Sequence, residues 1–183
     1  GKAAAQFLEC LPHDARSVMK DETLPVEEGL RRAVEDMIHA VARAIDDDRL
    51  EAFPDFFAEQ SVAVYKVASR FNVERGLPMA HINCANRGMI VDRVASLRHA
   101  NIFPAQRYRH MISGIHLTMN ADQSIAARSS YLVIRILEDG SSSVFSSGEY
   151  RDCIVLEQGV PRLRERLVIF DSRSIDSVLA IPL

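Results

Sequence analysis

This chain has no tryptophan, and it has only three cysteines and eight glycines among its 183 residues. Cys10, Cys84 and Cys153 form no Cys-x-x-Cys or Cys-x-His pair, which argues against a disulfide framework and against a cysteine-held zinc or iron–sulfur site. The expectation is therefore reduced thiols. The glycines are dispersed, so the sequence contains no glycine-rich loop of the kind that holds phosphates.

The chain also lacks a strong charge of either sign and a long apolar run. A net charge of −3 and a pI near 6.1 give no reason to expect nucleic acid as a partner. No apolar run approaches the length of a membrane span, and Gln6, Glu9 and Pro12 interrupt the only stretch that could resemble a signal peptide. We therefore expect a cytoplasmic protein without a membrane partner.

What the chain does have is enough apolar content, 48%, for a core. Residues 1–24 are expected to form a loosely ordered N-terminal arm, and residues 25–183 a single domain. Apolar side chains at helical spacing predict a helix from Pro25 to about Ile45, where three aspartates follow. Two more helices are expected over residues 49–58 and 87–99.

The remaining apolar runs have the character of β-strands. They cover residues 61–68, 77–84, 107–120, 125–137, 142–156 and 162–170, and Asp139-Gly140 between two of them is a strong hairpin signal. Helices gathered early and strands gathered late predict an α+β fold, with three helices packed on a strongly curved, mostly antiparallel sheet. This order is similar to that of cone-shaped folds of the nuclear transport factor 2 (NTF2-like, cystatin-like) type.

Histidines and carboxylates at close spacing are the candidate metal ligands of this chain. Asp36 and His39 are neighbours on the first helix, but no second histidine follows at helical spacing, so a solvent-facing pair is expected. His110 and His116 lie six residues apart on one strand, roughly 20 Å, which is too far to share an ion. We therefore expect no metal ion to be bound by these residues.

General acid–base chemistry remains an alternative. The mouth of a cone-shaped fold could gather His110, Tyr131, Tyr150 and Asp152 from neighbouring strands, which would suit a lyase or isomerase, or a protein that binds a small ligand. The other interpretation is that these residues only complete hydrogen bonds at strand ends. The sequence leaves both open, with His110, Tyr131 and Asp152 as the acid–base candidates.

Charged residues placed on the strands form the last signal. Cross-strand pairing of opposite charges explains them, but arginines on a sheet also suit a protein–protein interface, where they form planar bidentate bonds. The two explanations are compatible. The candidate interface residues are Arg107, Arg109, His110, Glu149, Arg151, Arg164 and Arg166.

Several segments carry a family resemblance through their order and spacing over about residues 28–183. They are Leu50-Glu51-Ala52-Phe53-Pro54-Asp55-Phe56-Phe57, Asp92-Arg93-Val94, Arg107-Tyr108-Arg109-His110-Met111-Ile112, Phe145-Ser146-Ser147-Gly148-Glu149-Tyr150-Arg151-Asp152, Arg162-Leu163-Arg164-Glu165-Arg166 and Ile181-Pro182-Leu183. Together they resemble the β (small) subunits of bacterial aromatic-ring-hydroxylating dioxygenases, the Rieske non-haem iron oxygenases. Within that family they look most similar to the terephthalate dioxygenase and salicylate hydroxylase small subunits.

The resemblance implies a non-catalytic, structural β subunit that serves in the catabolism of aromatic compounds. Such a subunit carries no cofactor, no metal and no catalytic residue of its own. It has the cone-shaped fold and assembles as a trimer with a catalytic α subunit, commonly as α3β3. The α subunit would carry the Rieske [2Fe–2S] cluster and a mononuclear Fe(II), and a separate reductase would supply electrons from NAD(P)H. One departure is Phe53, where the family often has tryptophan; this swap keeps an aromatic core residue.

Overall fold

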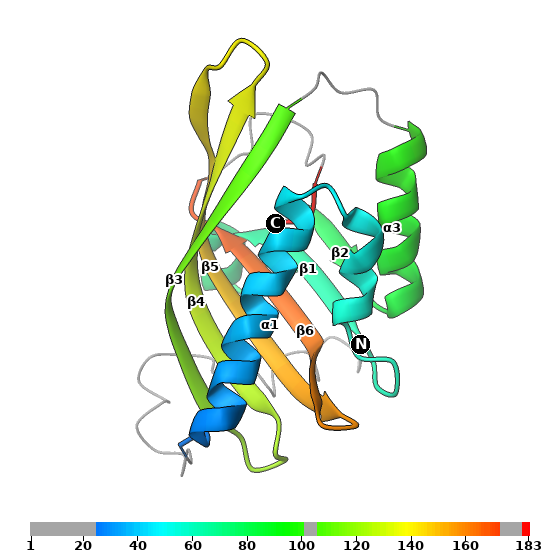
Figure 1. The fold of residues 1–183 in the computed structure, drawn as a ribbon, viewed down its shortest axis with the longest axis vertical. Coiled ribbons are helices and arrows are strands. Elements are labelled where there is room, and N and C mark those ends of the chain that lie inside the picture. The colour runs from blue at the N-terminus through cyan, green and yellow to red at the C-terminus, as the bar shows by residue number, and fades with distance from the viewer. Residues whose placement is uncertain (1–24, 101–105, 173–180) are drawn as a thin grey trace.

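The protein folds around one six-stranded mixed sheet with the strand order β2-β1-β6-β5-β4-β3. The computed structural model describes residues 25–100, 106–172 and 181–183, so the expected arm over residues 1–24 lies outside the described residues. Figure 1 shows the strands twisting strongly past one another, with α1 lying across one face of the sheet. Helices on a curved sheet confirm the α+β cone-shaped fold expected from the sequence.

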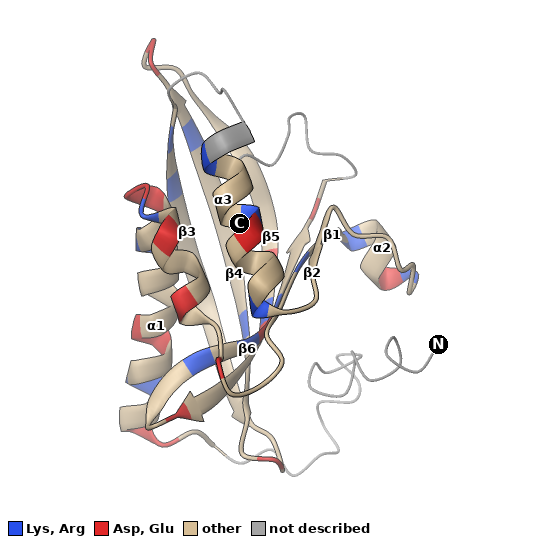
Figure 2. Ribbon diagram, turned by 90° about the vertical axis from the view of Figure 1, so that its right-hand side faces the viewer, with Lys and Arg blue, Asp and Glu red and all other residues tan. Residues whose placement is uncertain are grey.

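The described residues form four helical elements beside the sheet: α1 (Glu28–Asp46), the 3-10 helix η2 (Leu50–Phe56), α2 (Arg70–Glu74) and α3 (Arg87–Ala100). The side chain of Glu27 caps α1 by accepting hydrogen bonds from the backbone N–H groups of Gly29 and Leu30. These hydrogen bonds hold the pKa of Glu27 below its usual value. In the view of Figure 2, α1 and α2 lie on opposite sides of the sheet.

The strands are β1 (Val64–Ser69), β2 (Ile82–Cys84), β3 (Gln106–Met119), β4 (Ile125–Leu137), β5 (Ser142–Glu157) and β6 (Val160–Phe170). Strands β3 to β6 pair antiparallel in sequence order, whereas β6 returns to pair in parallel with β1. The expected hairpin is present at Gly140, which adopts a φ of +83°. The β4–β5 turn projects beyond the helices (Figure 1).

One glycine is required by close approach of two strands. Gly148 of β5 is paired with Phe170 of β6, and an added Cβ would lie 1.9 Å from the carbonyl oxygen of Ile169. That oxygen belongs to the backbone, so it cannot move aside as a flexible side chain would. A residue with any side chain at position 148 would therefore force the two strands apart.

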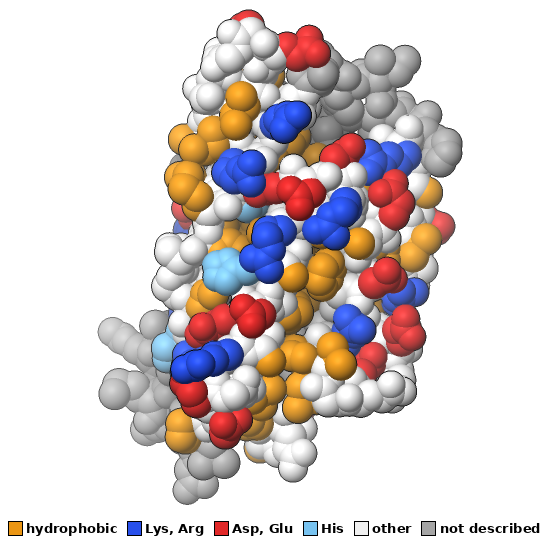
Figure 3. Space-filling view, in the orientation of Figure 1, with side chains coloured by type: hydrophobic (Ala, Val, Ile, Leu, Met, Phe, Trp, Pro, Cys, Tyr) orange, Lys and Arg blue, Asp and Glu red, His pale blue; other side chains and the backbone are white. Residues whose placement is uncertain are grey.

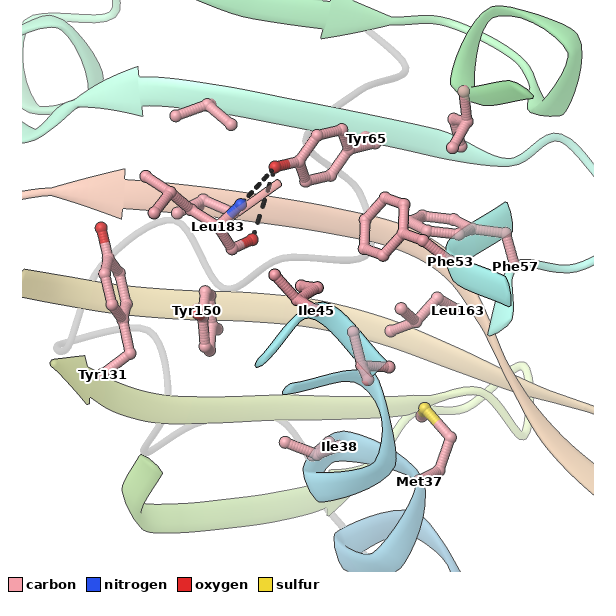
Figure 4. Packing of buried hydrophobic residues seen from close by; sticks show 14 of the residues in the cluster. Met37, Ile38, Ile45, Phe53, Phe57, Tyr65, Tyr131, Tyr150, Leu163 and Leu183 are labelled. Atoms are coloured by element: carbon pink, nitrogen blue, oxygen red, sulfur yellow. Dashed lines mark hydrogen bonds between the residues drawn. The ribbon is translucent and has the colours of Figure 1, made fainter. Parts of the chain in front are cut away.

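The core fills the space between α1 and the sheet with aromatic and branched side chains, as the close view in Figure 4 shows. Phe53 is 1% exposed and contacts Phe57 and Tyr65 edge-to-face, with centroids 5.3 Å away in both cases. This confirms Phe53 as an aromatic core residue. Leu183 is also fully buried, and its backbone N–H donates to the Tyr65 hydroxyl at 2.9 Å.

The largest differences from the expected elements lie between β1 and α3. Residues 77–84 were expected as a strand, but only Ile82–Cys84 pairs with β1, since Pro78 offers no N–H and the preceding turn is exposed. The helical turn α2 was not expected. The expected helix over residues 49–58 is a 3-10 helix, a short form that accommodates Pro54 in place of regular α-helical bonding.

Candidate subunit interface

A buried carboxylate–histidine pair joins the end of α1 to β3. The His110 side chain is 0% exposed, and its Nδ1 lies 2.6 Å from Oδ1 of Asp46, whose side chain is 4% exposed. The backbone N–H of His110 also donates to Asp46 Oδ2, with an N···O distance of 2.9 Å. The ring Nε2 is buried without a hydrogen-bond partner among the described residues. His110 is therefore fixed in place through both its backbone and its side chain.

A second buried pair joins β5 to β6. Asp152 and Arg166 lie directly opposite each other in the sheet, and the guanidinium donates to the carboxylate through Nε at 2.9 Å and Nη2 at 2.7 Å. Both side chains are at most 2% exposed, and the guanidinium also lies 4.7 Å from the Tyr150 ring centroid. Burial alone would lower the pKa of Arg166, but the Asp152 carboxylate outweighs it and raises that pKa.

Tyr131, the third acid–base candidate, is held by Ser146 and Tyr150. Its hydroxyl lies 2.9 Å from the Ser146 hydroxyl, and its ring stacks on Tyr150 with centroids 4.5 Å apart. Burial raises the pKa of Tyr131 well above its ordinary value, so this phenol stays protonated at neutral pH. The structure thus assigns Tyr131 a packing contact and a hydrogen bond within the core.

Two of the three acid–base candidates, His110 and Asp152, lie far apart on the sheet. His110 pairs across the sheet with Val133 of β4, and Asp152 pairs with Ala127 of the same strand. These two positions on β4 are six residues apart, roughly 20 Å along the strand. Each candidate also contacts a different polar partner, so the described residues do not bring His110 and Asp152 within proton-transfer distance.

The opposite face of the same strands carries a different charged group. Because side chains alternate along a strand, Glu149 and Arg151 point away from the face on which Tyr150 is buried. Arg151 lies opposite Arg128 of β4, and Glu149 binds both guanidinium groups, with 2.6 Å to Arg128 Nη2. Burial raises the pKa of Glu149, but the hydrogen bonds from Arg151 and Arg128 outweigh it and lower that pKa below its ordinary value.

Five of the seven interface candidates are exposed or half-buried, and the other two are buried. Arg107 and Arg109 are exposed on β3, and Arg164 is half-buried on β6, 3.2 Å from Asp122. Glu149 and Arg151 belong to the group on the outer face of the sheet. His110 and Arg166 are buried inside this chain and paired with carboxylates, which favours a role in the fold over a direct contact with a partner. The interface role of these seven residues stays a prediction.

The face that carries α1, η2 and α3 shows acidic and basic side chains interspersed, as Figure 3 shows. Arg98 of α3, for example, binds Glu51 of η2 at 2.6 Å and Asp48 at 2.8 Å. Arg87 similarly binds Asp55 at 2.8 Å. These ion pairs connect neighbouring helices and leave no large area of one charge sign in this view.

The metal candidates are also placed by the structure. Asp36 is exposed and His39 half-exposed on α1, while His116 is exposed on β3. Across residues 25–100, 106–172 and 181–183, no three His, Cys, Asp or Glu side chains are grouped as metal ligands. No helix in this part of the chain combines the length and apolar character needed to cross a membrane.

All three cysteines were expected to be reduced thiols, and Cys10 lies outside the described residues. Cys84 is a buried free thiol, as the sequence predicted. Cys153 is disulfide-bonded, so the expectation of reduced thiols is wrong for that residue.

Sequence reasoning missed Asp46 and Ser146. Asp46 lies 64 residues from His110, and nothing in the local pattern connects them. One signal was available: a carboxylate at the C-terminal end of a helix is unfavourable for the helix dipole, so a tertiary partner could have been sought. Ser146 carries no comparable signal.

Comparison with known proteins places this geometry in a family. Residues 29–166 match the model of the SnoaL-like domain, which agrees with the helices packed on a curved sheet. The crystal structure of the β subunit assigned to an aromatic-ring-hydroxylating dioxygenase from Novosphingobium aromaticivorans superposes with a TM-score of 0.76. It is 35% identical, over 85% of this chain and 98% of that chain. The class of protein is thus a SnoaL-like domain of the cone-shaped type.

Curated relatives narrow the class further. The anthranilate 1,2-dioxygenase small subunit of Burkholderia cepacia is 37% identical over 76% of this chain and 85% of the relative. The beta 1 subunit of the terephthalate 1,2-dioxygenase terminal oxygenase component of Comamonas sp. is 35% identical over 79% and 92%. This chain belongs to the small, or β, subunits of aromatic-ring-hydroxylating dioxygenases.

Proposed function

We propose that this chain is the non-catalytic β subunit of an α3β3 oxygenase that works in the cytoplasm. Its role is to hold and orient an α subunit that carries the Rieske [2Fe–2S] cluster and the mononuclear Fe(II). A separate reductase delivers electrons from NAD(P)H to that α subunit. The chemistry of ring hydroxylation takes place there, and the β chain supplies a rigid support.

One observation carries this proposal: the arginines and carboxylates of the sheet separate into closed interior pairs and a partly exposed outer group. Asp152 and Arg166 satisfy each other in the interior, whereas Arg128 and Arg151 share the single carboxylate of Glu149. Guanidinium groups that share one acceptor retain donors for carboxylates of another chain. Such a surface suits a polar protein–protein interface.

We further propose that the complete enzyme acts on an aromatic carboxylate. The relatives named above belong to dioxygenases for anthranilate and terephthalate, and both of these compounds are aromatic carboxylates. The substrate would bind in the α subunit, so no residue of this chain is assigned to its recognition.

Co-expression with the α subunit of the same organism tests the proposal. We expect one complex with the mass of α3β3 by light scattering, and oxygenase turnover of anthranilate or terephthalate when reductase and NADH are added. A benzene-ring compound without a carboxylate serves as the substrate control. An α subunit that is fully active alone and forms no complex with this chain would refute the structural role.

The alternative of a self-sufficient lyase, isomerase or ligand-binding protein is less supported. The required acid–base residues are spread along the sheet, and each is already bound to another side chain. Proton exchange or elimination catalysed by the isolated chain, lost in His110→Gln, would restore that alternative.

A further inference from the structure

Among the strands that the structure describes, β3 forms one edge of the sheet and pairs with β4 alone. It is 14 residues long. A long edge strand offers unpaired backbone groups to strands of other chains, which leads to strand addition unless the edge is blocked. How β3 is blocked therefore decides how a partner can bind it.

The Asp46–His110 pair occupies the middle of this edge. The N–H of His110 donates to the Asp46 carboxylate, so it points away from β4. In an antiparallel strand every second residue faces the same way, so Tyr108 and Ile112 share the direction of His110. The carboxylate is buried and belongs to α1, so an added strand could not form a continuous ladder here.

The side chains between these positions remain available. Arg107 and Arg109 alternate with the buried Tyr108 and His110 and are exposed, with the Arg109 side chain 61% exposed. The Arg109 guanidinium lies 3.8 Å from the Asp46 carboxylate, a long distance for an ion pair, and that carboxylate already accepts a hydrogen bond from His110. Met111, 46% exposed, follows on the same side. Two exposed guanidinium groups two residues apart fit a pair of carboxylates on another protein.

We propose that β3 binds an acidic surface of the α subunit through the side chains of Arg107 and Arg109, and that the Asp46–His110 pair prevents strand addition at this edge. The choice of α subunit as the occupant rests on the proposed function. The blocking of the β3 edge does not depend on the proposed function. The Asp46–His110 pair would prevent a strand of any other chain, including a second copy of this one, from adding to that edge. Asp46 is in this scheme a positioning residue, which acts through His110.

The isolated chain tests the blocked edge. In Asp46→Ala, hydrogen exchange of the His110 amide should become at least roughly tenfold faster, because the N–H loses its acceptor. The mass by light scattering should also rise with concentration beyond that of the wild type. Asp46→Asn keeps an acceptor oxygen and should show a smaller change. Unchanged exchange and unchanged mass in a folded variant would overturn the proposal, and Asp46→Asn decides if Asp46→Ala does not fold.

Titration of this chain with the α subunit tests whether Arg107 and Arg109 contribute to binding. Charge reversal in the double variant Arg107→Glu/Arg109→Glu should raise the Kd at least roughly tenfold and weaken its dependence on salt. Arg32→Glu, on the exposed side of α1, is the matched control and should bind as the wild type does. Equal binding by the double variant and the control would overturn the arginine contact. Failure of the wild type to bind would instead refute the proposed function, while the isolated-chain result still decides the edge.

Discussion

The two faces of β5 use the same chemistry in opposite ways. On the inner face Asp152 holds Arg166 in a one-to-one bidentate pair, with both side chains at most 2% exposed. On the outer face two arginines share Glu149, and the Arg128 side chain remains 43% exposed. The inner pair is complete within the monomer, whereas the outer group keeps unused donors. Burial, and not residue type, therefore separates a charge that maintains the fold from one that suits assembly.

The largest effect is expected from breaking the inner pair. Asp152→Ala leaves the Arg166 guanidinium buried without its carboxylate, which should lower the free energy of unfolding by about 3–5 kcal/mol. Urea unfolding of the isolated chain measures it. The matched outer variant Glu149→Ala should cost much less, since water can solvate Arg128. Equal losses in the two variants would abolish the distinction between the faces.

Gly148→Ala tests how closely the inner face is packed. The added Cβ would meet the Ile169 carbonyl oxygen at 1.9 Å, so β5 and β6 must separate. Overpacking of this kind costs about 1–3 kcal/mol, and the upper part of that range is expected because backbone must move. Thermal unfolding gives the value, with Ser147→Ala on the neighbouring half-buried position as the control. A stable Gly148→Ala protein would mean that the strands can separate freely.

Tyr131→Phe should have a moderate effect on the same face. It removes the hydroxyl that is hydrogen-bonded to Ser146 while keeping the ring stacked on Tyr150, which should cost about 1 kcal/mol. A double-mutant cycle with Ser146→Ala isolates the hydrogen bond from other losses. Strictly additive single variants would show that the two hydroxyls do not stabilise each other.

The smallest effect is expected from the charge of Glu149, and it should depend on pH. The pKa of Glu149 in the folded protein lies below its ordinary value of 4.5, since the arginines favour the carboxylate. Its contribution to stability is thus complete above 4.5 and is lost as pH falls through the lower folded pKa. The stability difference between wild type and Glu149→Gln, measured by urea unfolding, should shrink on acidification. A stability difference that grows at acid pH would contradict a lowered pKa of Glu149 in the folded protein.

The sequence predicted most elements because their patterns are local. The apolar spacing before Ile45, the Asp139-Gly140 hairpin and the alternation along the four long strands are each contained in a short window. Short elements were less predictable, since α2 spans five residues and β2 only three. Segments this short are determined by their neighbours rather than by their own residues.

The sequence indicated that the charged residues on the strands form ion pairs or an interface, but it did not show which of them are buried in the core. Arg166 and Arg164 are two residues apart on β6, yet one is buried against Asp152 and the other half-buried beside Asp122. Spacing alone cannot separate them, because a β-bulge beside Cys153 shifts the register between β5 and β6. The pairing of Asp46 with His110 was equally inaccessible, since it depends on how α1 crosses the sheet.

The parallel pairing of β6 with β1 has a consequence for the order in which the chain folds. β6 lies between β1 and β5 in the sheet, and it is the last of the described strands along the chain. During synthesis, β1 and β2 must therefore wait for residues 160–170 before they can join β3, β4 and β5 in one sheet. Contacts of such long sequence separation slow folding and leave strand edges exposed for longer. A nascent chain of this kind would benefit from chaperone protection until β6 has emerged from the ribosome.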